Sequence, residues 1–131
     1  MKLNCDLGES FGQWQLSDEA QVMPHIDMAN VACGFHAGDP STIANTLKLA
    51  KQHNVNVGAH PAYPDLAGFG RRSMNIALAD IAPMLHYQIS ALDGMAKCAG
   101  LMLRYVKPHG ALYNDMMANP ALFTAIMQAV A

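Results

Sequence analysis

Four short apolar segments recur along the chain, and each is followed by a stretch with helical signals. The segments are residues 2–7, 26–33, 55–60 and 101–106. The second of them is largely apolar and stops at Gly34, as expected of a strand that is buried on both faces. This alternation predicts an α/β fold, with a parallel sheet and helices packed outside it. A doubly wound sheet and a barrel satisfy the pattern equally.

Capping residues mark where the helices begin. Ser17, Asp39 and Asn119 each precede a helix-like stretch and can accept a hydrogen bond from its first turn. Gly100 is a natural end for the third and longest helix. The helices are expected over residues 17–24, 39–52, 77–99 and 121–131. The loop over residues 61–75 is long for a compact domain, and such loops are usually functional or mobile.

Composition excludes several classes of protein. Apolar residues make up 52% of the 131 residues and charged residues only 14%, which suits one folded domain rather than a disordered chain. The net charge of -2 offers no basic surface for nucleic acid. No apolar run reaches the roughly 18 residues of a membrane span, and Met1–Asp6 does not resemble a signal peptide. Three cysteines without a pairing pattern indicate reduced thiols, so we expect a cytoplasmic protein.

Polar side chains gather where the predicted strands end. In a parallel sheet these ends meet on one edge, which is where active sites form. Asp6 is a charge in an otherwise apolar strand, and a buried carboxylate is costly without a partner. Lys107 likewise needs an acid or an anionic ligand nearby. The predicted catalytic residues are Asp6, His36, His60, Lys107 and His109.

Other candidates carry weaker signals. His25, His53 and His86 lie in or at the ends of predicted helices, and we interpret them as surface or packing residues. Cys33 is interpreted as a small buried apolar residue rather than a nucleophile. The adjacent Arg71 and Arg72 are either a solvated pair or a clamp for a phosphate or carboxylate.

Two mechanisms fit these residues. Asp6, His36 and His60 could hold a divalent metal ion that activates water. Alternatively, Lys107 and the arginine pair could bind a phosphorylated substrate, with Asp6 as the base. The sequence has no dinucleotide-binding glycine motif, no phosphate-binding P-loop and no paired metal-binding histidines on one helix.

Taken together, the motifs resemble the LamB/YcsF family. They are Asn4–Glu9, Ala29–Pro40, Gly58–Pro61, Tyr63–Asp65, Gly68–Arg72 and Val106–Asn114. The resemblance covers the whole chain in the right order. It implies a parallel (β/α) barrel of the glycoside hydrolase/deacetylase type. It also implies the A subunit of an ATP-dependent 5-oxoprolinase, which works with B and C subunits to open 5-oxo-L-proline to L-glutamate.

The resemblance also suggests roles for the strand-end residues. A cyclic amide is a poor electrophile, and phosphorylation of its oxygen by ATP would activate it for attack by water. Lys107 and Arg71 or Arg72 would bind the phosphate or the substrate carboxylate. Asp6, His36, His60 and His109 would transfer protons or hold a metal. The predicted substrate- and phosphate-binding residues are Asn4, Glu9, Asp39, Arg71 and Arg72.

This chain is shorter than a complete barrel, which takes about 250 residues. Residues 1–131 supply about four βα units, so we expect the N-terminal part of a single barrel domain, truncated. We expect it to self-associate as a homodimer and to have little oxoprolinase activity alone. Two alternatives remain. One is a metal-dependent deacetylase or carbohydrate hydrolase of the same fold, and the other is an inactive fragment that only binds partner subunits.

Overall fold

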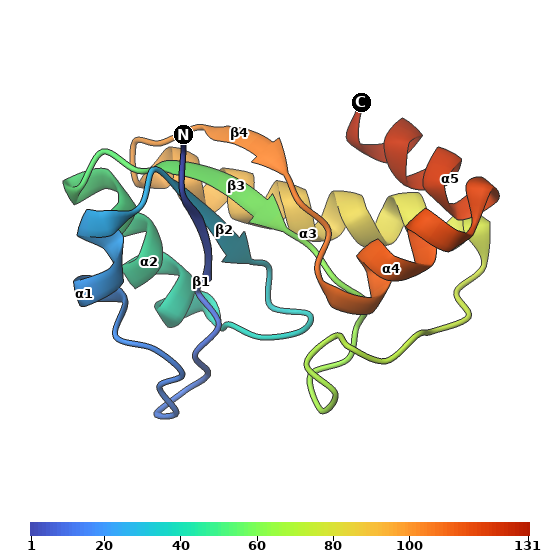
Figure 1. Ribbon diagram of the computed structural model, residues 1–131, viewed down its shortest axis with the longest axis horizontal. Coiled ribbons are helices and arrows are strands. Elements are labelled where there is room, and N and C mark those ends of the chain that lie inside the picture. The colour runs from blue at the N-terminus through green and yellow to red at the C-terminus, as the bar shows by residue number, and fades with distance from the viewer.

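The computed structural model describes residues 1–131, with a four-stranded parallel sheet at its centre (Figure 1). The strands are β1 (Asn4–Leu7), β2 (Met28–Ala32), β3 (Asn56–His60) and β4 (Leu103–Val106). They lie in the order β1-β2-β3-β4, so each strand is next to its successor along the chain. The sheet therefore winds in one direction, as in a barrel, without the reversal of order that defines a doubly wound sheet. The expected α/β fold is confirmed, and the sheet is consistent with part of a barrel.

The helices follow the predicted order with one addition. They are α1 (Glu19–Val22), η1 (Met23–His25), α2 (Pro40–Gln52), α3 (Leu78–Cys98), α4 (Gly110–Ala118) and α5 (Pro120–Val130). Asp39 caps α2 by accepting a 2.9 Å bond from the Thr42 amide, and Asn119 caps α5, as expected. No helix combines the length and the apolar character that a membrane crossing requires.

Two boundaries differ from the sequence prediction. The first helix has Asp18 rather than Ser17 at its N-cap, and it tightens into a 3-10 turn at Pro24 after a single α-helical turn. Helix α4 was not predicted, because it opens on Gly110 and its apolar residues do not form a clear stripe. The strands also begin one or two residues later than the apolar segments suggest, a difference that is common at element ends.

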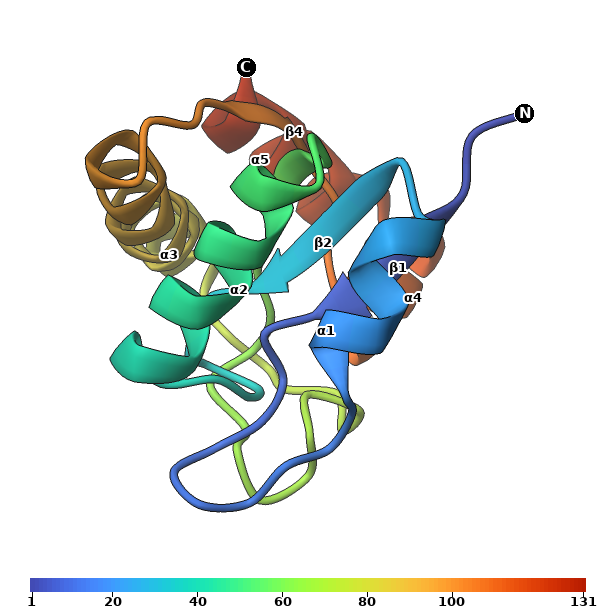
Figure 2. The ribbon, with the colours of Figure 1, turned by 90° about the vertical axis from the view of Figure 1, so that its left-hand side faces the viewer.

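One face of the sheet builds the main core. Leu7, Val31 and Val57 project from neighbouring strands and pack against Leu47 of α2 and Leu92 of α3. Figure 2 shows α2 and α3 on the same side of the sheet. A second core forms where the N-terminal half of α3 meets α4 and α5, around Leu85, Leu112 and Ile126. Helix α3 is long enough to serve both cores, so it joins the sheet to the C-terminal helices.

The opposite face of the sheet is polar. Strand register places Asp6 beside Asn30 and Asn30 beside Gly58, so these positions share that face. The Tyr105 ring occupies the space that a Cβ at position 58 would fill, so only glycine fits there. Tyr105 lies across strand β3 in this way and reaches Asn30 two strands away.

Candidate functional site

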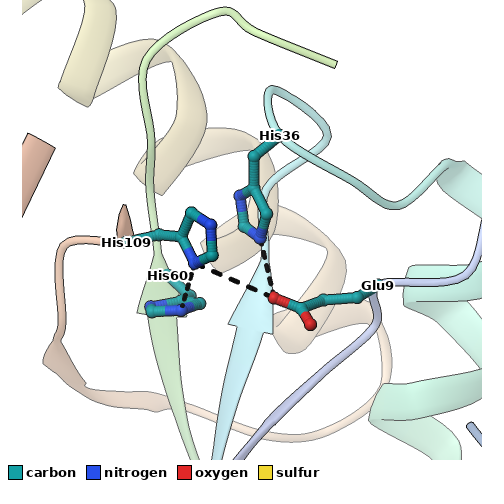
Figure 3. A group of neighbouring side chains, drawn as sticks. All are labelled: Glu9, His36, His60 and His109. Atoms are coloured by element: carbon teal, nitrogen blue, oxygen red, sulfur yellow. Dashed lines mark hydrogen bonds and ion pairs between the residues drawn. The ribbon is translucent and has the colours of Figure 1, made fainter. Parts of the chain in front are cut away.

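Three buried histidines and one glutamate meet at the carboxyl ends of the strands (Figure 3). His60 is the last residue of β3, and His109 directly precedes α4. His36 lies in the loop between β2 and α2, and Glu9 follows β1. The parallel topology brings these four side chains to one place, because every strand ends on the same edge of the sheet.

Short contacts connect the members of this cluster. His36 Nε2 lies 2.8 Å from Glu9 Oε1, and His109 Nδ1 lies 3.0 Å from His60 Nε2. The His36 and His109 rings stack with their centroids 3.7 Å apart and their planes 8° from parallel. On their far sides, His60 Nδ1 contacts the Lys107 carbonyl at 2.5 Å and His109 Nε2 contacts the Phe69 carbonyl at 2.8 Å. We call Glu9, His36, His60 and His109 the histidine cluster.

The histidine cluster has the donor types of a metal site. One ligand atom from each of its residues lies within 4.8 Å of the others. The membership differs from the predicted set of Asp6, His36 and His60, because Glu9 and His109 join the two histidines while Asp6 turns to Lys107. The four residues of the cluster come from four separate chain segments, and their spacing along the sequence is irregular.

Asp6 is the centre of a second, polar network. Its Oδ1 accepts bonds of 2.8 Å from Lys107 Nζ and 2.7 Å from the Asn30 amide, and its Oδ2 lies 3.5 Å from His60 Nε2. Asn30 also donates to Asn4 Oδ1 at 2.8 Å and accepts a 2.7 Å bond from the Tyr105 hydroxyl. The predicted residues Asn4, Asp6 and Lys107 therefore lie together. Asn30 and Tyr105 were not predicted, although both stand on the same strand face as other polar residues.

The environment lowers the pKa of Asp6 and the pKa values of two histidines, but for different physical reasons. The neighbouring His60, Lys107 and Asn30 side chains hold the pKa of Asp6 well below its ordinary range and outweigh the opposing effect of burial. Burial lowers the pKa of His36, and it lowers that of His109 to about 4. At neutral pH the site therefore contains an ionised Asp6 together with the uncharged imidazoles of His36 and His109. Such a carboxylate is a weak base, because it binds a proton poorly.

Gly70 allows the long loop to close over the histidines. Its φ of +64° lies in the left-handed region that favours glycine. A Cβ at this position would lie 2.8 Å from His36 Cβ and 2.9 Å from His109 Cδ2. The Gly70 carbonyl also accepts a 2.9 Å bond from the Ala111 amide at the start of α4. The loop is thus fastened both to the cluster and to the helix that follows His109.

Comparison with known proteins places the chain in a family. The pattern described as the LamB/YcsF family matches residues 1–131. The chain belongs to the LamB/YcsF family. It is 61% identical over 128 residues to the 5-oxoprolinase A subunit of Pseudomonas fluorescens strain Pf0-1, covering 98% of this chain and 51% of that protein. It is 52% identical over 131 residues to the 5-oxoprolinase A subunit of Vibrio parahaemolyticus, covering 100% and 52%.

A solved structure of a related protein has the same fold. The crystal structure of a lactam utilization protein from Thermus thermophilus matches with a TM-score of 0.95 and 45% sequence identity. The match covers 98% of this chain and 52% of the other. The chain thus spans about half the length of the relatives that it matches. The predicted family is confirmed.

Three of the predicted substrate-binding residues in this LamB/YcsF chain lie outside both the histidine cluster and the polar network around Asp6. Arg72 forms an ion pair with the buried Asp65 carboxylate, and the Arg71 guanidinium lies 5.4 Å from the centre of the Phe69 ring. Asp39 caps α2 and accepts a 2.7 Å bond from the Gly12 amide. Asp65 and Asp39 thus have clear structural partners, whereas the exposed Arg71 has no acidic partner among the ion pairs of the chain.

The remaining sequence candidates have structural roles. Cys33 is buried, and burial raises the pKa of its thiol to about 12, which makes it a poor nucleophile near neutral pH. His25, His53 and His86 are exposed and none of them belongs to the histidine cluster, in agreement with the prediction.

An apolar pocket of about 170 Å³ borders Glu9 and His36. Its walls come from three loops, those that follow β1, β2 and β3. The apolar lining residues are Phe11, Trp14, Leu16, Ala37, Leu66 and Phe69. The sequence did not predict a pocket here, since side chains in separate loops show no periodicity. The pocket offers a small organic molecule a way to reach the edge of the cluster.

Proposed function

We propose that this chain forms part of the A subunit of an ATP-dependent 5-oxoprolinase, which opens 5-oxo-L-proline to L-glutamate together with B and C subunits. The observation that carries the proposal is the similarity of 98% of the chain to proteins named as the A subunit of 5-oxoprolinase. We further propose that residues 1–131 are the N-terminal part of a single barrel domain, since the chain spans about half of those relatives.

The polar network around Asp6 suits an anionic intermediate. Phosphorylation of the lactam oxygen by ATP would create a good leaving group and add negative charge. The Lys107 side chain is 44% exposed beside Asp6, so its ammonium can donate to Asp6 and also to an anion at the strand ends. Lys107 would in this way bind the phosphate or the substrate carboxylate.

We assign proton transfer to the histidines. Asp6 is held as a weakly basic carboxylate, so it orients Lys107 and His60 rather than removing a proton from water. An uncharged imidazole in the cluster can accept that proton. The pocket beside Glu9 and His36 would exclude bulk water from the methylene side of the substrate ring.

The test is ATP-dependent release of glutamate from 5-oxoproline by the chain combined with the B and C subunits. Lys107→Ala should lower the rate at least about 100-fold, by analogy with the loss of one stabilising donor at a reacting centre. Lys48→Ala, at an exposed position on α2, is the matched control and should retain the rate. Equal rates for the two variants would contradict the assignment of Lys107. Binding of the B and C subunits without any glutamate release would instead support the inactive, partner-binding fragment.

A metal-dependent deacetylase or carbohydrate hydrolase is the second candidate function. The histidine cluster favours it, because histidine and glutamate are ligands of hydrolytic metal ions. Hydrolysis of an acetylated sugar by the chain in the absence of ATP would identify this activity. A strict requirement for ATP would favour the oxoprolinase.

A further inference from the structure

Two backbone carbonyls determine which ring nitrogens of the cluster carry hydrogen. A carbonyl oxygen only accepts hydrogen bonds, so His60 Nδ1 must donate to the Lys107 carbonyl and His109 Nε2 must donate to the Phe69 carbonyl. The other nitrogen of each uncharged ring then has a lone pair and no hydrogen. These two nitrogens are His60 Nε2 and His109 Nδ1.

The two lone pairs point at each other. His60 Nε2 and His109 Nδ1 are 3.0 Å apart. Two electron-rich carboxylate oxygens lie near them, with Glu9 Oε1 3.9 Å from His109 Nδ1 and Asp6 Oδ2 3.5 Å from His60 Nε2. Electron-rich atoms at this separation repel unless a cation lies between them. The cation can be a proton or a metal ion, and the side chains of His60 and His109, only 1% and 6% exposed, surround its position away from bulk water.

We propose that Glu9 Oε1, His60 Nε2 and His109 Nδ1 bind one divalent transition-metal ion, with Zn²⁺ as the expected species, and that His36 positions Glu9. One carboxylate and two imidazoles are a ligand set that zinc hydrolases use. Histidines that bind a metal usually donate their other N–H to a carbonyl or a carboxylate, which fixes the ring. His60 and His109 both show this arrangement before any ion is bound.

Distances within the cluster fit such an ion. Zinc–nitrogen and zinc–oxygen bonds of about 2.0–2.2 Å in a tetrahedral site place ligand atoms about 3.3–3.6 Å apart. The separation of His60 Nε2 from His109 Nδ1 is 3.0 Å, and that of His109 Nδ1 from Glu9 Oε1 is 3.9 Å. These two separations fall just below and just above the expected range, so small rotations of the side chains suffice.

His36 differs from the other two histidines. Its Nε2 contacts Glu9 Oε1 at 2.8 Å rather than a carbonyl, and its Nδ1 is buried without a hydrogen-bond partner. His36 therefore holds the Glu9 carboxylate against the cluster. Three protein ligands leave a fourth position for water or a substrate oxygen, which is the arrangement of catalytic rather than structural zinc.

Metal binding itself tests the proposal and does not depend on the oxoprolinase activity. The chain is dialysed against Zn²⁺ to measure stoichiometry and affinity, and against Co²⁺ to record the visible spectrum. We expect one ion per chain and a Co²⁺ spectrum of nitrogen and oxygen ligands. Glu9→Gln and His109→Ala should weaken binding more than about 100-fold, and His36→Ala by about 10- to 100-fold, the range for residues that orient a ligand.

Controls separate loss of the site from loss of the fold. His53→Ala removes an exposed histidine and should bind the ion like the unsubstituted chain. Thermal unfolding of each metal-free variant shows whether it folds, and Glu9→Gln keeps the size of the side chain if His109→Ala unfolds. Absence of binding by the folded chain would overturn the proposal. Unchanged affinity in Glu9→Gln, or a Co²⁺ spectrum with thiolate bands, would overturn it as well.

Discussion

Glu19 is a buried carboxylate that holds the chain in place directly before Glu9. It accepts a 2.6 Å bond from the Gly8 amide and a 2.5 Å bond from the Thr46 hydroxyl. Thr46 lies on α2, so Glu19 ties the end of β1 to the helix that covers the sheet. The structure therefore gives Glu19 a positioning role next to the histidine cluster.

Replacing Glu19 should destabilise the protein and loosen the loop that carries Glu9. Glu19→Ala leaves the buried Gly8 amide and Thr46 hydroxyl without their acceptor, at a cost of about 1.5–3 kcal/mol in the free energy of unfolding. Urea unfolding measures this change. Asp80→Asn, at an exposed position in the first turn of α3, is the control and should cost less than about 1 kcal/mol. Similar losses for both variants would mean that the buried bonds contribute little.

Asp65 should make part of the stability dependent on pH. Hydrogen bonding to Arg72 lowers the pKa of Asp65 in the folded chain below its value of about 3.9 in the unfolded chain. The stabilisation is therefore present above about pH 4 and is lost as the pH falls through the lower, folded-state pKa. Asp65→Asn should lower the melting temperature at pH 7, and the difference from the unsubstituted chain should shrink at about pH 3. A difference that stays constant over this pH range would count against this ion pair.

Strand β3 and helix α3 each contain a glycine, and the space around the two glycines differs. Gly58 in β3 leaves room for the Tyr105 ring, whereas Gly94 in α3 is exposed and a Cβ there would meet no atom within 4 Å. Glycine stabilises a helix less than alanine does, because its backbone loses more conformational freedom on folding. The two glycines therefore form a matched pair for substitution.

Alanine at these two positions should change stability in opposite directions. Gly58→Ala should cost about 1–3 kcal/mol, because Tyr105 must move and lose its bond to Asn30. Gly94→Ala should add about 0.5–1 kcal/mol. Thermal and urea unfolding of both variants measure the changes. An unchanged free energy of unfolding in Gly58→Ala would show that the position of Tyr105 over β3 does not stabilise the fold.

At the scale of the whole molecule, the sheet has two open edges. Strand β1 pairs only with β2, and β4 pairs only with β3, so one side of each edge strand offers unpaired amides and carbonyls. A barrel removes such edges by closing the sheet. The uncovered face between these edges contains polar residues of the candidate site, including Asp6, Asn30 and Lys107.

We expect the chain to associate with a second copy in solution, since pairing of edge strands would satisfy these backbone groups. Sedimentation velocity at micromolar concentration should show a dimer whose fraction falls on dilution. Circular dichroism of the same samples monitors the fold. A chain that remains both monomeric and cooperatively folded across the concentration range would contradict the expectation.

Local sequence patterns determined the elements and the edge on which the site lies. Alternating apolar segments and caps such as Asp39 and Asn119 reflect interactions within one turn or one strand, so they are readable from neighbouring residues. The position of Asp6, His60 and Lys107 at strand ends followed from parallel topology, which places all carboxyl ends together. Helix α4 escaped prediction because its local signals are weak.

Only the tertiary structure decided how the side chains combine. Glu9 meets His36 across 27 residues, and His60 meets His109 across 49, so no local pattern encodes these contacts. Lys107 and Asn30 hold one Asp6 oxygen with their donors, and Glu9 is the carboxylate that contacts His36. The sequence by itself determined an α/β chain with reactive residues at one edge. The packing of separate loops determined which of them form a buried cluster, because burial and hydrogen bonding are properties of the assembled fold.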